Sequence, residues 1–128
     1  MYGFSTKLKK MPFDAAVTKV TEALKQEGFG VLTDIDVQAT LKGKLDIEHR
    51  PYRILGACNP PLAHRALQLE DKVGTMLPCN VIVQDKAEGM VEVSAVDPVA
   101  SMQAIDNPRL QGVAATVRDK LKAVVDGL

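Results

Sequence analysis

The chain has 128 residues, of which 46% are hydrophobic and 25% charged, and its sixteen basic residues balance sixteen acidic ones. This length and composition predict one globular domain over residues 1–128, with a core of its own. Zero net charge and few aromatic residues argue against a nucleic-acid partner, and no run approaches the roughly 18 apolar residues that cross a bilayer.

The N-terminal segment predicts a strand followed by an amphipathic helix. Large and polar residues alternate over residues 2–8, which is typical of a strand with one buried face. Apolar residues then recur at three- and four-residue steps over residues 12–27. This spacing puts them on one stripe of a helix, and Gly28 is the residue type that ends such a helix.

The next stretch becomes less regular as the chain proceeds. Residues 29–37 predict a second strand, because β-branched residues alternate along it. Residues 38–50 carry a mixed pattern. A helical turn is indicated at residues 39–42, and Gly43 argues against a longer helix.

A third strand over residues 52–57 leads directly to Cys58. Asn59 is a favoured N-cap residue, and Pro60 suits the first helical position, where a missing amide costs nothing. The sequence therefore predicts that a short helix begins immediately after the cysteine.

The C-terminal half predicts a hairpin and a long helix. Residues 79–84 and 90–96 are β-branched apolar runs joined by a short polar loop. Asn107 caps a final amphipathic helix that begins at Pro108 and stops at Gly127. Two long amphipathic helices and a largely antiparallel sheet predict an α+β fold of the two-layer sandwich type.

Five motifs follow one another in a recognisable order. They are residues 28–37, residues 40–44, Tyr52-Arg53-Ile54-Leu55-Gly56-Ala57-Cys58-Asn59-Pro60, Leu77-Pro78-Cys79-Asn80-Val81 and Val96-Asp97-Pro98. In these motifs the chain resembles the bacterial and archaeal "domain of unknown function 302" family. The resemblance covers essentially the whole chain. It implies a TATA-binding-protein-like sandwich that commonly forms a homodimer, and it implies no established activity.

Cys58 and Cys79 are the only cysteines, and each lies beside proline at a predicted strand end. If the third and fourth strands are antiparallel, we expect their Cα atoms within about 7 Å of each other, the limit for bridging. Cys58 precedes a helix N-terminus, which favours a thiolate, so we expect it to be the more reactive thiol. No signal peptide is visible, and we expect a cytoplasmic protein with reduced thiols.

Three interpretations of the cysteines remain open. The favoured one is core packing, because free cysteine packs like a small hydrophobe. The second is a redox or nucleophilic site in which Cys79 or His64 assists Cys58. The third is metal binding, which the spacing disfavours because zinc ligands usually occur in close pairs; we therefore expect no metal. Three methionines are interpreted as core filler rather than part of a flexible apolar pocket: Met76, Met90 and Met102.

Four positive charges gather within twelve positions, at Lys42, Lys44, Arg50 and Arg53. With the amides at the start of the Pro60 helix, Lys44 and Arg53 predict a site for a small anion, although a solvated rim is the commoner role for such charges. The leading hypothesis is a small homodimeric domain that binds a small ligand or anion.

The residues of that predicted site are Lys44, Arg53, Cys58, Asn59, Cys79 and Asn80. A thiol-dependent enzyme or redox sensor using Cys58 and a purely structural assembly module are the alternatives, so catalytic activity stays undecided. The identity of the ligand or cofactor stays undecided as well.

Overall fold

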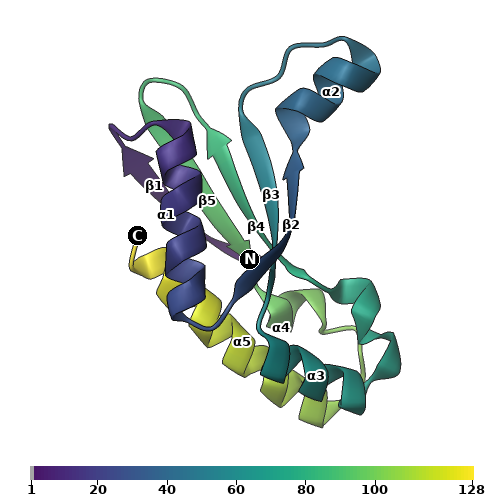
Figure 1. Cartoon of the computed structure of the whole chain (residues 1–128). Helices are drawn as coiled ribbons and strands as arrows, with labels where there is room; N and C mark the ends of the chain where they lie inside the picture. The colour runs from purple at the N-terminus through teal and green to yellow at the C-terminus, as the bar shows by residue number, and fades with distance from the viewer. Residues whose placement is uncertain (1) are drawn as a thin grey trace.

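The computed structural model describes residues 2–128, which form one five-stranded sheet with helices packed on one side (Figure 1). The strands are β1 (Gly3–Lys9), β2 (Gly30–Asp36), β3 (Tyr52–Cys58), β4 (Cys79–Asp85) and β5 (Met90–Val96). The helices are α1 (Phe13–Gln26), α2 (Val37–Leu45), α3 (Pro60–Leu69), α4 (Pro98–Ser101) and α5 (Pro108–Asp126), with a 3₁₀ turn η1 (Asp71–Met76). The strand order is β1-β5-β4-β3-β2, and every neighbouring pair is antiparallel.

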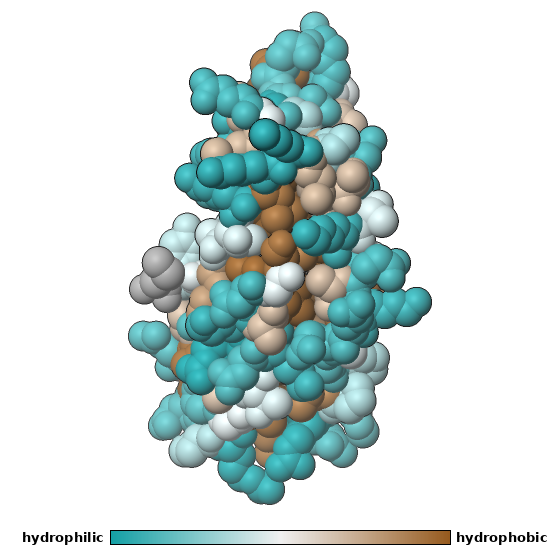
Figure 2. All heavy atoms as spheres, turned by 90° about the vertical axis from the view of Figure 1, so that its left-hand side faces the viewer, coloured by the Kyte–Doolittle hydropathy of each residue, from teal (hydrophilic) through white to brown (hydrophobic). Residues whose placement is uncertain are grey.

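The main core lies between the sheet and the helices α1 and α5. Alternate residues of the three central strands are buried beneath these helices, as the period-two pattern predicts. The helices contribute their apolar stripes, including Val20 and Leu24 from α1 and Leu121 from α5. Seen from the left-hand side of Figure 1, the surface is mostly hydrophilic, with a strip of apolar atoms down its middle (Figure 2). No helix within residues 2–128 is long and apolar enough to cross a membrane.

A second apolar cluster lies beyond the end of the sheet. The first half of α5 contributes Leu110, Val113 and Ala114 to it, and the rest of the cluster comes from α3, η1 and the segments in and around α4. The second half of α5 contributes Leu121 and Val125 to the main core instead. A single 19-residue helix therefore belongs to both clusters.

Two asparagine caps fix the helices around this second cluster. The Asn59 side-chain oxygen accepts a hydrogen bond from the Leu62 amide at the start of α3, and its amide nitrogen donates to the Glu27 carbonyl at the end of α1. Asn107 does the same for α5, accepting from the Leu110 amide and donating to the Leu69 carbonyl. Each cap thus joins its own helix to the end of another one.

Within residues 2–128, no helix covers the other face of the sheet (Figure 1). One row across it consists of Ile35, Ile54 and Ile82 in register, followed by Ser94 and Ser5. The two serine hydroxyls are hydrogen-bonded at 2.7 Å. This row is therefore apolar over β2, β3 and β4 and polar over β5 and β1.

Next to this row lies a buried polar side chain, Gln84, which is only 7% exposed. Its carbonyl oxygen accepts hydrogen bonds from the Nε and Nη2 atoms of Arg50 at 3.2 and 2.7 Å. Its amide nitrogen donates to Glu92 at 3.1 Å. Because these partners satisfy its polar atoms, Gln84 tolerates burial on the sheet face.

The prediction of a single helical turn after β2 is wrong, because α2 runs for nine residues and includes Gly43. The Asp36 carboxylate caps it by accepting a hydrogen bond from the Ala39 amide at 3.0 Å. Lys42 forms ion pairs with Asp46 and Glu48 near its end. Capping and ion pairing thus outweigh the low helix propensity of glycine.

Candidate ligand site

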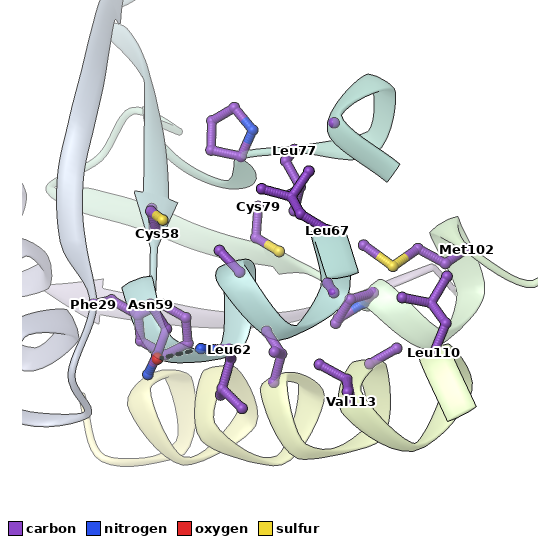
Figure 3. A pocket seen from close by; sticks show the side chains of 18 of the residues that line it. Phe29, Cys58, Asn59, Leu62, Leu67, Leu77, Cys79, Met102, Leu110 and Val113 are labelled. Atoms are coloured by element: carbon purple, nitrogen blue, oxygen red, sulfur yellow. Dashed lines mark hydrogen bonds between the residues drawn. The ribbon is translucent and has the colours of Figure 1, made fainter. Parts of the chain in front are cut away.

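The two cysteines lie on adjoining strand ends, because β3 and β4 are antiparallel with Ala57 opposite Cys79. From standard strand spacings this register puts the Cα atoms of Cys58 and Cys79 about 6 Å apart. Successive side chains of a strand point to opposite faces, however, so the two thiols do not face each other. Figure 3 shows the Cys79 sulfur directed towards α3, whereas the Cys58 sulfur lies apart at the end of β3. Both cysteines are free.

A cavity of about 310 Å³ lies between this end of the sheet and the second cluster (Figure 3). Helices α3 and α5 form two walls, and η1 and α4 close the far side. It is lined by Phe29, Leu32, Ala57, Cys58, Asn59, Leu62, Ala63, Ala66, Leu67, Gly74, Leu77, Pro78, Cys79, Pro98, Met102, Leu110, Val113, Ala114 and Val117. Apart from Asn59 and the two cysteines, these lining residues carry no polar side-chain group.

Cys79 lies on the buried side of the cavity and is 6% exposed. Burial, and to a smaller extent the charge of Cys58, raises the pKa of the Cys79 thiol to about 11. Because the thiolate is the nucleophilic form, Cys79 is a neutral and weakly reactive group at neutral pH. It contributes to the cavity as a small apolar surface.

The mouth of the cavity is also apolar. Leu32 and Leu67 are 68% and 44% exposed, although both are large hydrophobic residues. The β2–β3 ladder shifts register between Val31 and Thr33, so Leu32 is the extra residue of a bulge. Bulges re-aim side chains next to binding sites, and this one places a leucine at the cavity entrance.

Three of the predicted site residues have other positions or partners. Asn59 lines the cavity, but both ends of its side-chain amide already make the capping bonds described above. Asn80 follows Cys79 in β4 and is exposed in a hollow on the open face of the sheet. His64 is exposed on α3 and is not part of the cavity wall.

The structure does not bring Lys44 and Arg53 together with the start of α3, because both residues lie at the other end of β3. Lys44 belongs to α2, which projects from the far end of β2 and β3 (Figure 1). Arg53 is five residues from Cys58, which is about 16 Å along a strand. Its guanidinium pairs with Asp34 through two hydrogen bonds. This pairing lowers the pKa of the Asp34 carboxyl.

The cavity was not predictable from the sequence, because η1 and α4, which close its far side, have no clear pattern. Met102 is buried in the second cluster, as the core-filler interpretation predicts, and its side chain also lines the cavity. Helix α4 has four residues and η1 has six, too few to show a period. Within residues 2–128 no group of three or more histidine, cysteine or acidic residues is placed to hold a metal ion.

Comparison with known proteins supports the resemblance described above. The family model "Domain of unknown function DUF302" matches residues 4–128. The fold is similar to the crystal structure of an uncharacterized conserved DUF302 protein from Bacillus stearothermophilus, with 30% identity and a TM-score of 0.89. That alignment covers 98% of this chain and 97% of the other. A search of curated proteins gave no match.

Proposed function

This chain belongs to the DUF302 family of domains of unknown function, and on that premise we propose that it is a small-molecule-binding domain whose ligand occupies the cavity beside Cys79. The cavity itself carries the proposal. Protein interiors are normally filled to crystal-like density, whereas about 310 Å³ is left open here. Ligand pockets have this character: a volume of some 300 Å³ or more, mostly apolar walls and a few polar groups.

Substitutions that fill the cavity test this proposal. Ala114 is 2% exposed on α5 and lines the cavity, so Ala114→Leu introduces three heavy atoms into the open volume. Ala123→Leu is the matched control, because Ala123 is exposed on the same helix. A chemically mixed fragment library is screened by amide NMR, with native mass spectrometry of the purified protein alongside.

We expect fragments whose shift changes map to the cavity and are lost in Ala114→Leu but kept in Ala123→Leu. The absence of any ligand in both experiments, or shift changes confined to another surface, contradicts the proposal.

The partner in this proposal is a second copy of the chain, bound through the open face of the sheet. The in-register row of Ile35, Ile54 and Ile82 gives this face an apolar centre, and Ile35 is 48% exposed. In a dimer with a two-fold axis through this row, the row of one copy packs against the same row of the other copy. The chain carries zero net charge, so two copies do not repel each other.

The same five-stranded sheet with two long helices on one face supports a TATA-binding-protein-like class for the sandwich.

A thiol-dependent activity is the second candidate, and one observation favours it. Cys58 is partly exposed and immediately precedes the Asn59 cap of α3. Partial exposure beside a helix N-terminus is typical of reactive cysteines. Cys79 does not suit the role of partner nucleophile, because it is buried and neutral. A reactive role therefore rests on Cys58, and alkylation of Cys58 much faster than that of free cysteine at the same pH is the result that would support this second candidate.

A further inference from the structure

We infer that the ligand of the Cys79 cavity is a neutral molecule of about twelve non-hydrogen atoms, with an apolar body and at most one hydroxyl or carbonyl group. This inference rests on the proposed function and adds the chemistry of the ligand. The size follows from the volume: a cavity of about 150 Å³ accommodates benzene with its six carbons, and this cavity is about twice as large, at 310 Å³.

The absence of charge in the ligand follows from the wall. None of the described residues that line the cavity is an acid, a lysine, an arginine or a histidine. A carboxylate or ammonium group buried against such a wall loses its hydration without a partner, which costs several kcal/mol or more. Cys79 offers no compensating charge, because burial keeps its thiol protonated at neutral pH.

The number of polar groups in the ligand follows from the hydrogen-bonding partners on the wall. Asn59 is the one strong side-chain donor and acceptor among the described lining residues. Its bonds to Leu62 and Glu27 are long, at 3.3 and 3.5 Å, and each amide atom retains a further bonding position. A single ligand hydroxyl uses both positions, donating to the amide oxygen and accepting from the amide nitrogen, and no other lining side chain offers a strong partner to a second polar group.

The shape follows from the passage of the apolar lining from exposed to buried residues. Leu32 and Leu67 are 68% and 44% exposed, whereas Met102 and Leu110 are 4% and 0% exposed. An alkyl chain or a fused pair of aromatic rings occupies such a path throughout. The Met102 thioether adapts to either shape, because methionine has flexible rotamers and a polarisable sulfur.

Two pairs of probes test the inference, each consisting of a neutral and a charged molecule of similar size. They are octan-1-ol with octanoate, and 2-naphthol with 2-naphthoate. Each is titrated at pH 7 into the full chain while the amide shifts of cavity residues are followed. We expect both neutral probes to bind at least tenfold more tightly than their carboxylate partners. Binding should be lost in Ala114→Leu and kept in Ala123→Leu.

The outcomes separate this inference from the proposed function. Carboxylates that bind as tightly as the neutral probes overturn the inference and leave a ligand cavity in place, as does a failure of all four probes when other library fragments still bind there. Failure of the probes and of the whole library overturns both. Neutral probes that still bind Ala114→Leu occupy another site, which overturns the inference. If Ala114→Leu does not fold, Ala63→Leu on the α3 wall replaces it.

Discussion

At the residue scale, the two thiols differ because the sheet places them in different surroundings. Cys79 is buried. Cys58 is partly exposed and follows Ala57, the residue that pairs with Cys79 across the strands. The sequence predicts that both cysteines lie at strand ends. It does not show which of them points to which face of the sheet, and this difference separates the two sulfurs. Their closeness depends on the antiparallel pairing of β3 and β4, which the sequence leaves open, and their failure to face each other depends on the register.

This difference predicts unequal alkylation rates. In Cys58→Ser, the remaining Cys79 should react with iodoacetamide much more slowly than a free thiol at pH 8, because a pKa of about 11 leaves little thiolate. In Cys79→Ser, the remaining Cys58 should react readily without unfolding. Mass spectrometry of timed samples gives both rates. A Cys79 that reacts as fast as free cysteine contradicts the assignment.

The raised pKa of Cys79 also predicts a pH dependence of stability. The thiol has a pKa of 9.0 as its reference value and about 11 in the fold. The protonated form is therefore favoured by folding, and the resulting stabilisation is complete below pH 9 and lost as pH rises through about 11. Relative to Cys79→Ala, the wild type should lose up to about 3 kcal/mol of unfolding free energy over this range. Urea titrations at several pH values measure the difference, and parallel curves contradict the prediction.

Gly56 provides a test of packing between the strand and Pro78. A Cβ atom at this position would lie 2.7 Å from the Pro78 Cγ atom and in collision with the Thr33 hydroxyl. Gly56→Ala should destabilise the protein by about 1–3 kcal/mol, the usual cost of overpacking. Gly30→Ala is the control, since a Cβ there meets nothing within 4 Å. Equal unfolding midpoints for the two variants would show that Pro78 moves aside freely.

At the element scale, the long elements were predictable and the short or capped ones were not. The apolar stripes of α1 and α5 and the alternation of β4 and β5 have enough turns or residues to show their period. Helix α2 has no such stripe, because none of its nine described residues is buried. The helix is stabilised by a capping bond and ion pairs. In the sequence these are outweighed by Gly43, which argues against a helix.

The dependence of α2 on its cap predicts local unfolding in Asp36→Ala. Loss of the bond to the Ala39 amide should cost α2 about 1 kcal/mol. Amide exchange should accelerate over Val37–Leu45, with little change in the global unfolding free energy, because α2 contributes nothing to the core. Asn59→Ala is the contrasting variant, since that cap also binds α1, and it should lower global stability. Unchanged exchange in α2 is the result that rules out a capping role.

At the scale of the whole molecule, the uncovered sheet face predicts self-association. Sedimentation at micromolar concentration should give about twice the chain mass of 13.8 kDa. Ile35→Glu places a charge in the apolar row and should weaken the dimer at least tenfold. Leu45→Glu is the control, because Leu45 is equally apolar and 63% exposed but belongs to α2. A wild-type monomer at all concentrations removes the proposed partner.

The passage of α5 through both apolar clusters has a thermodynamic consequence. Because one continuous helix supplies Leu110 to one cluster and Leu121 to the other, neither cluster can melt without disrupting the helix that the other needs. Occupancy of the cavity is then linked to unfolding of the entire chain: a ligand at one hundred times its Kd adds about 2.7 kcal/mol to the global free energy of unfolding. Amide protons in β1, on the far edge of the sheet, should therefore exchange more slowly when the cavity is filled.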